Sequence, residues 1–128
     1  MAFTLTTQLE FSAAHRLRGY DGNCARLHGH NWKVEISLTG SQLNDVGMLI
    51  DFKEIKRTGK HILAQLDHYY LNDIPPFDAE LNPTAENIAK YICESLQVNA
   101  AFQAEKIDVQ SVQVWESPRS AVMYKPEG

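Results

Sequence analysis

The chain has few of the features that mark secreted, membrane-bound or multi-domain proteins. Only two of its 128 residues are cysteine, which allows one disulfide bond at most and is more typical of free thiols in a cytosolic protein. No apolar run exceeds a few residues, so we expect no segment that spans a bilayer. The N-terminus shows no secretory signal pattern, and no tract rich in proline, glycine or serine divides the chain. We therefore expect a single cytoplasmic domain over residues 1–128.

An excess of positive charge is also lacking. The chain has 12 Lys and Arg residues against 16 Asp and Glu residues, which gives a formal charge of −4. Nucleic-acid-binding domains usually carry a basic excess, so we expect no nucleic-acid partner. A small phosphorylated ligand stays compatible with this charge, because a few local Lys or Arg residues would suffice to bind it.

Two segments near the N-terminus alternate between apolar and polar residues, which is typical of strands with one buried face. In residues 3–15 the apolar positions are Phe3, Leu5, Leu9, Phe11 and Ala13. In residues 28–38 they are Trp32, Val34, Ile36 and Leu38. The residues between these segments, 16–27, include several glycines and indicate a loop.

Two helices are expected in the middle of the chain. Asp51 can cap the first, with Glu54 three residues later as in a capping box, and an apolar stripe follows as far as Leu66. Gly59 weakens the middle of this helix. After a proline-containing loop at residues 72–83, Thr84 can cap a second helix, whose apolar stripe consists of Ile88, Ala89, Ile92, Cys93 and Leu96.

The last third of the chain returns to strand patterns. The apolar parity changes between Val109 and Val112, so we expect a β-bulge at Gln110–Ser111. A turn at residues 117–120 leads to a final strand at 121–125. The order of elements predicts an α+β fold, in which two helices cover one face of a four-stranded antiparallel sheet. The uncovered face and the sheet edges predict a homo-oligomer.

Three histidines occupy matching positions on the first two strands. His28 and His30 are two residues apart, so their side chains leave the same face, and His15 ends the apolar parity of the first strand. Antiparallel pairing would bring the three imidazoles together, as in a catalytic zinc site with an open fourth position. The alternative is a pair of solvated or hydrogen-bonded loop histidines, because short His-x-His pairs arise by chance. The matching parity of His15 favours zinc.

The two cysteines have different settings. Cys24 lies four residues before His28, where a nearby cation would raise its thiolate fraction and suit it as a base or nucleophile. It could instead be a fourth zinc ligand or an inert loop residue. Cys93 lies in the apolar stripe of the second helix and is expected to pack in the core.

Four further ionisable residues need an interpretation. Asp67 and His68 could form an acid/base pair, but neighbouring residues on a helix do not face each other, so spacing alone favours a solvated surface. His61 has no partner in the pattern and is expected at the surface. Glu116 shares the strand parity of the apolar residues before it, so its carboxylate is expected to point inward and to need hydrogen-bond donors. These could come from a ligand with paired NH and NH₂ groups, or from an internal Arg or Lys.

These residues lie in motifs that together resemble the 6-pyruvoyl-tetrahydropterin synthase family, including its bacterial branch, 6-carboxy-tetrahydropterin synthase of queuosine biosynthesis. The motifs occur in order at residues 11–17, 24–31, 50–52, 66–68, 71–75, 82–86 and 115–117. The resemblance implies a ββααββ tunnelling (T-fold) subunit, whose sheets join into a barrel by oligomerisation. Hexamers with active sites between subunits are common in the family. It also implies that His15, His28 and His30 hold zinc.

The same resemblance implies a role for each remaining candidate. Cys24 would abstract a proton, and Asp67 and His68 would form an acid/base relay with it, completed by residues of a neighbouring chain. Glu116 would anchor the pterin ring. Residues that bind the triphosphate are not identified; four cations are candidates only because they lie near loops: Arg16, Arg26, Lys33 and Arg119.

The implied reaction converts 7,8-dihydroneopterin triphosphate to 6-carboxy-5,6,7,8-tetrahydropterin, with release of acetaldehyde and triphosphate. Cys24 and His28 are separated by three residues, as in the carboxy-forming branch, whereas the pyruvoyl-forming branch typically has a longer spacing. Two departures are a slightly longer segment at residues 76–81, and Trp115-Glu116-Ser117 in place of a more common Lys-Glu-Thr. The alternatives are the same site stopping at the pyruvoyl product, and a zinc-stabilised binding module without catalysis.

Overall fold

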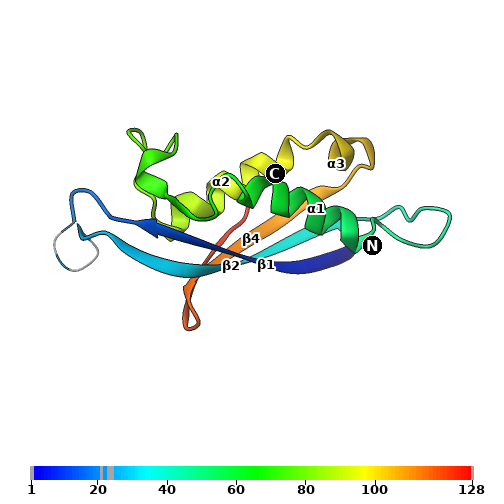
Figure 1. Ribbon diagram of the computed structural model, residues 1–128. Helices are drawn as coiled ribbons and strands as arrows, with labels where there is room; N and C mark the ends of the chain where they lie inside the picture. The colour runs from blue at the N-terminus through cyan, green and yellow to red at the C-terminus, as the bar shows by residue number, and fades with distance from the viewer. Residues whose placement is uncertain (1, 21, 23–24, 128) are drawn as a thin grey trace.

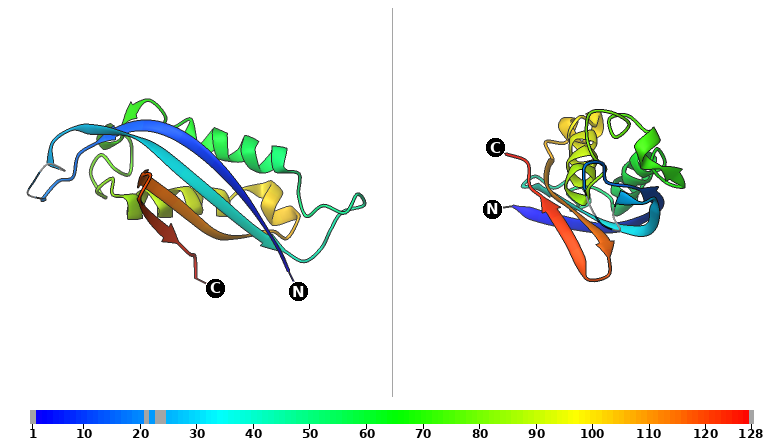
Figure 2. Two further views of the ribbon diagram at one scale, coloured as in Figure 1. Left: turned by 90° about the horizontal axis from the view of Figure 1, so that it is seen from below. Right: turned by 90° about the vertical axis from the view of Figure 1, so that its left-hand side faces the viewer.

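The computed structural model describes residues 2–20, 22 and 25–127 of the chain. The elements follow one another as β1 (Phe3–His15), β2 (His28–Gly40), α1 (Phe52–Leu63), β3 (Tyr69–Tyr70), the 3₁₀ helix η2 (Leu71–Asp73), α2 (Ala85–Gln97), α3 (Ala100–Ala104), β4 (Asp108–Ser117) and β5 (Ser120–Tyr124). The helices lie together over one face of the sheet (Figure 1). The end-on view in Figure 2 shows the two layers, helices above and sheet below. The expected α+β class is confirmed.

β1 and β2 form a long antiparallel pair, as the alternating pattern predicts. Phe3 lies opposite Gly40 at one end, and His15 lies opposite His28 at the other. The apolar positions of both strands face the helices, and Trp32, Val34 and Ile36 are fully buried. β4 pairs antiparallel with β2, and Gln110 is the extra residue that shifts the register between Ser111 and Val109. The expected bulge is therefore confirmed.

The sheet has five strands rather than the expected four, in the order β3-β1-β2-β4-β5. The additional strand, β3, is only two residues long and pairs parallel with Ala13 and Ala14 of β1. A third helix, α3, is also absent from the expectation. It is five residues long, and the Asn99 side chain caps it by accepting hydrogen bonds from the backbone N–H groups of Ala101 and Phe102. Both elements are too short for hydrophobic periodicity to indicate them.

The expected caps of the two main helices are confirmed. The Asp51 carboxylate accepts a hydrogen bond from the Lys53 N–H at 2.8 Å, and the Thr84 hydroxyl accepts one from Asn87 at 3.1 Å. The capping box is not formed, because the Glu54 carboxylate instead accepts a hydrogen bond from Arg57 at 2.6 Å. α1 ends at Leu63, three residues before the end of the apolar stripe, and the turn that follows carries Asp67 and His68.

Gly59 lies where α1 crosses the sheet. A Cβ atom at this position would stand 2.5 Å from Leu9 Cδ1 and 3.0 Å from Ile36 Cδ1. The residue that weakens the helix locally is therefore the one that lets its backbone approach β1 and β2. The core beneath α1 and α2 includes Cys93 as expected, and burial raises the pKa of this thiol to about 11.

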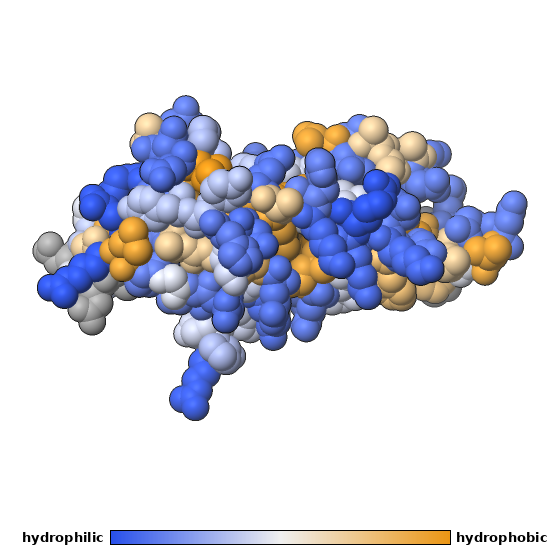
Figure 3. All heavy atoms as spheres, in the orientation of Figure 1, coloured by the Kyte–Doolittle hydropathy of each residue, from blue (hydrophilic) through white to orange (hydrophobic). Residues whose placement is uncertain are grey.

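Figure 3 shows one side as mostly hydrophilic, interrupted by small, separate hydrophobic areas. In the described part of the chain, no helix has both the length and the apolar character needed to cross a membrane. His61 is exposed, as expected.

Candidate metal centre

The end of the β1–β2 pair brings the three candidate histidines together. His15 lies directly opposite His28, and His30 lies opposite Ala13, so all three side chains reach the same end of the apolar face. Their ring centroids are 4.5 Å apart for His15 and His28, 4.8 Å for His28 and His30, and 5.2 Å for His15 and His30. Each ring can offer one nitrogen, and these three nitrogens all lie within 4.8 Å of one another. The three histidines could therefore hold a metal ion.

Backbone carbonyl groups orient two of the rings. His15 Nδ1 lies 2.7 Å from the carbonyl oxygen of Pro83, and His28 Nδ1 lies 2.7 Å from that of Arg26. A carbonyl oxygen only accepts, so each Nδ1 carries the hydrogen and each Nε2 keeps a free lone pair. Such contacts from the second ring nitrogen are the usual support of histidine ligands in metal sites.

The unused nitrogens give independent evidence for an ion. His15 Nε2 and His30 Nε2 are buried and have no hydrogen-bond partner. His15 as a whole is only 1% exposed. A buried polar atom without a partner costs free energy, which a bound cation would offset. The arrangement fits a metal-binding centre better than a structural cluster of histidines.

Burial also sets the charge of these rings. It is the main cause that lowers the pKa of His15, against an opposing contribution from the Pro83 carbonyl. The pKa of His30 is lowered for the same main reason, although the nearby Glu116 carboxylate raises it. Both rings are therefore neutral near pH 7, which is the form that binds metals.

Glu116 faces the histidines, in agreement with the parity of β4. One carboxylate oxygen lies 3.9 Å from His15 Nε2 and the other lies 3.6 Å from His30 Nε2. The alternative of an internal pair with Arg or Lys is not formed among the described residues. The carboxylate is 36% exposed, so it borders both the histidine cluster and solvent.

Asp67 and His68 are in contact, which corrects the argument from helical spacing. They follow the end of α1, and His68 has a φ of +65°, so the two residues do not lie on a helix. His68 Nδ1 lies 3.0 Å from Asp67 Oδ1, which also accepts a hydrogen bond from the Ser12 N–H at 2.8 Å. The Ser12 contact is the main cause that lowers the pKa of Asp67, with His68 contributing.

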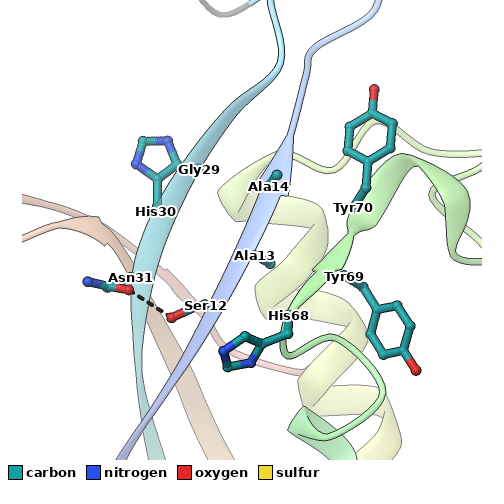
Figure 4. Close-up of a pocket in the computed structure, with 9 residues that line it drawn as sticks. All are labelled: Ser12, Ala13, Ala14, Gly29, His30, Asn31, His68, Tyr69 and Tyr70. Atoms are coloured by element: carbon teal, nitrogen blue, oxygen red, sulfur yellow. Dashed lines mark hydrogen bonds between the residues drawn. The ribbon is translucent and has the colours of Figure 1, made fainter.

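His68 and His30 border the same hollow. This hollow has a volume of about 500 Å³. In Figure 4, His30 comes from β2 and His68 from the turn on the other side of β1. His68 is 80% exposed and is not among the three histidines that could share an ion.

Of the remaining candidates, Lys33 borders a hollow that Glu116 and His30 also line. Cys24 lies outside the described residues, as do its neighbours 21 and 23. Lys33 packs with its Nζ 4.2 Å from the ring centre of Trp115, and the side chains of Arg16, Arg26 and Arg119 are exposed.

Two asparagines that no sequence pattern indicated hold the segment that follows β1. Asn72 accepts a hydrogen bond from the Arg16 N–H and donates one to the Arg16 carbonyl, both at 3.0 Å. Asn82 makes the same pair of contacts with Arg18, at 2.9 and 2.8 Å. Both lie in motifs on which the family resemblance rests. A pattern of residues, however, carries no signal for a side-chain amide that takes the place of a neighbouring strand as the hydrogen-bond partner.

The chain is similar to known proteins over almost its whole length. The family model described as 6-pyruvoyl tetrahydropterin synthase matches residues 4–127. The 6-carboxy-5,6,7,8-tetrahydropterin synthase of Bacillus subtilis is 35% identical over 98% of this chain and 87% of its own. The 6-pyruvoyl tetrahydrobiopterin synthase of Dictyostelium discoideum is 30% identical over 96% of each. The solved structure of Caenorhabditis elegans 6-pyruvoyl tetrahydropterin synthase aligns with a TM-score of 0.82 at 27% identity, over 99% of this chain and 97% of that one.

Proposed function

Because the chain belongs to the 6-pyruvoyl tetrahydropterin synthase family, we propose that it is a zinc-dependent lyase acting on 7,8-dihydroneopterin triphosphate. The products are 6-carboxy-5,6,7,8-tetrahydropterin, acetaldehyde and triphosphate, in the pathway to queuosine. The observation that carries the proposal is the cluster of three ring nitrogens within 4.8 Å, in a chain whose relative with 35% identity bears the name of the carboxy-forming enzyme.

The metal in this proposal is zinc, held by His15, His28 and His30. Three neutral imidazoles are the ligand set of many catalytic zinc sites, and the partnerless Nε2 atoms of His15 and His30 suit such an ion. Bound zinc supplies Lewis-acid stabilisation of negative charge that develops on the side-chain oxygens of the pterin. The backbone carbonyls at Pro83 and Arg26 keep two of the rings in the required tautomer.

The chain's own residues handle the protons and the ring. Cys24, as a thiolate, takes a proton from the pterin side chain. His68, oriented by Asp67 at 3.0 Å, exchanges protons with the side-chain oxygens. Glu116 accepts hydrogen bonds from the paired NH and NH₂ groups of the pterin ring. His68 and Glu116 lie in separate hollows of one subunit, and His68 is mostly exposed, which supports completion of the site by another chain.

We propose that the protein is a cytoplasmic homo-oligomer, with a hexamer favoured. Among the described residues, β1 pairs on its outer side only at Ala13 and Ala14, and β5 pairs only with β4. Long unpaired strand edges are normally covered, and joining the edges of neighbouring copies would close the sheets into the barrel expected of this fold.

Production of the 6-pyruvoyl compound from the same substrate is the second candidate, favoured by the similarity to the Dictyostelium discoideum protein. A non-catalytic zinc module is the third. It predicts that Cys24 is a zinc ligand, so that Cys24→Ala would lose the metal, whereas the enzyme would keep it.

The deciding experiment incubates the zinc-loaded protein with 7,8-dihydroneopterin triphosphate and follows acetaldehyde and pterin masses. Acetaldehyde with a carboxypterin, both absent with Cys24→Ala, is the expected result. A pyruvoyl product without acetaldehyde would replace the first candidate by the second. No turnover by a protein with bound zinc would contradict both enzymatic candidates.

A further inference from the structure

We propose that Glu116 is an exchangeable fourth ligand of the metal ion: it completes the coordination in the substrate-free protein and leaves when a pterin binds. The first part rests on the geometry of the described residues. The second part rests on the proposed function, because it assigns the pterin ring to the same carboxylate.

The spacing of Glu116 from the histidines fits ligands that share one ion. Its two oxygens lie 3.6 Å from His30 Nε2 and 3.9 Å from His15 Nε2. Both distances exceed the usual range of an N–H···O hydrogen bond, about 2.7–3.2 Å. Zinc bonds of about 2.0–2.2 Å in a tetrahedron separate neighbouring ligand atoms by about 3.3–3.6 Å. The distances to His15 and His30 are thus at most a few tenths of an ångström longer than those between ligands that share one ion. Glu116 makes no such close approach to His28 in the described structure, so its side chain must also shift toward that ring to reach the fourth position.

The two nitrogens that face Glu116 are the ones without partners. His15 Nε2 and His30 Nε2 are buried and make no hydrogen bond to the carboxylate beside them. His15, whose Nδ1 hydrogen points at the Pro83 carbonyl, cannot donate from Nε2, so its lone pair and the Glu116 carboxylate would repel each other. A divalent cation between the three groups turns this repulsion into attraction.

The backbone at Glu116 departs from regular strand pairing. The ladder between β2 and β4 ends at the pair Lys33–Trp115. The ladder between β4 and β5 skips Glu116, because Trp115 pairs with Ala121 and Ser117 pairs with Ser120. Glu116 is thus the extra residue of a bulge, a feature that commonly redirects a side chain beside a functional site.

A second environment for the carboxylate lies next to the cluster. Glu116 and His30 both line a hollow of about 480 Å³, which Trp115 and Lys33 also border. A pterin ring in this hollow can offer two N–H donors to the carboxylate in a bidentate arrangement. Turning toward these donors would remove Glu116 from the ion. The closed site would then become an open one only in the presence of substrate.

Cobalt substitution tests the first part, because Co²⁺ absorbs visible light according to its coordination whereas Zn²⁺ is silent. Co²⁺ titrations would record the visible spectrum of the wild-type protein, Glu116→Gln and Glu116→Asp. Zn²⁺ titrations in competition with a chelator would measure the zinc affinity of the same three proteins. Glu10→Gln is the matched control, because Glu10 lines the same hollow from β1. We expect Glu116→Gln to weaken metal binding by about tenfold or more and to change the cobalt spectrum. Glu10→Gln should do neither.

The second part is tested with unsubstituted pterin, which has no side chain to reach the metal. Adding it should move the wild-type cobalt spectrum toward that of Glu116→Gln, and it should weaken Zn²⁺ binding by the same factor by which Zn²⁺ weakens pterin binding. A wild-type spectrum that ignores bound pterin would overturn the exchange.

The ligand role itself would be overturned if Glu116→Gln, folded by circular dichroism, matched the wild type in both affinity and spectrum. Glu116→Asp keeps the carboxylate on a side chain that is one methylene shorter, so it tests whether metal binding depends on the position of the carboxylate. None of these measurements requires turnover. A protein that releases no acetaldehyde but loses metal affinity on Glu116→Gln would therefore contradict the proposed reaction and leave the ligand role standing.

Discussion

Gly59→Ala provides a direct test of how α1 rests on the sheet. In an exposed helix position, alanine would stabilise the helix over glycine by about 1 kcal/mol. At Gly59, the new Cβ would stand 2.5 Å from Leu9 Cδ1 and 3.0 Å from Ile36 Cδ1, both in the core. Overpacking of this kind costs about 1–3 kcal/mol. The structure therefore predicts a net loss of about 1 kcal/mol, although local propensity predicts a gain of the same size.

Thermal and urea unfolding measure this difference. For 128 residues, the entropy of unfolding is about 0.27 kcal/mol/K, so Tm should fall by about 4 °C. Lys56→Ala and Lys56→Gly calibrate the propensity term, because Lys56 is an exposed residue of the same helix. Leu9→Ala should cost less in the Gly59→Ala protein than in the wild type, by about 1 kcal/mol, because it relieves the overlap. If Gly59→Ala raised Tm by as much as Tm differs between Lys56→Gly and Lys56→Ala, the close approach of α1 to the sheet would be refuted.

Three further predictions concern the metal centre and its support. With free zinc at a hundred times its Kd, the free energy of unfolding should rise by about 2.7 kcal/mol and the Tm measured by calorimetry by about 10 °C. His15→Ala should abolish this rise in Tm, whereas the control His61→Ala should keep it. Because burial lowers the pKa of His15 and His30, the folded metal-free protein binds fewer protons than the unfolded chain below about pH 6.5. Its free energy of unfolding, measured by urea titration, should therefore fall as the pH drops from 7.5 to 5.5. A free energy of unfolding that rises over this drop in pH would contradict the assigned burial. Asn82→Ala removes two hydrogen bonds to the Arg18 backbone and should cost about 1–2 kcal/mol, with Asn82→Asp intermediate; a loss below about 0.5 kcal/mol would mean that the contact carries no weight.

The sequence alone determined the elements whose signal is local and repeated. The alternation in β1 and β2 is long enough to identify the strands and their buried faces, and a change of parity in β4 identifies the bulge at Gln110. Asp51 and Thr84 predicted where α1 and α2 begin, because a capping side chain binds N–H groups within three residues of it. The three histidines were predictable for the same reason, since strand parity and antiparallel pairing of the two consecutive strands place them together.

Only the tertiary structure decided the contacts between segments that are far apart in the chain. Asp67 reaches the Ser12 N–H, and Asn82 pairs with Arg18, across more than fifty residues in each case. No period in the sequence encodes such pairs, because they depend on where α1 ends and how the loop before α2 turns back. Gly59 shows the difference most directly. Its local cost to the helix is visible in the sequence, whereas its benefit exists only where the helix backbone meets Leu9 and Ile36.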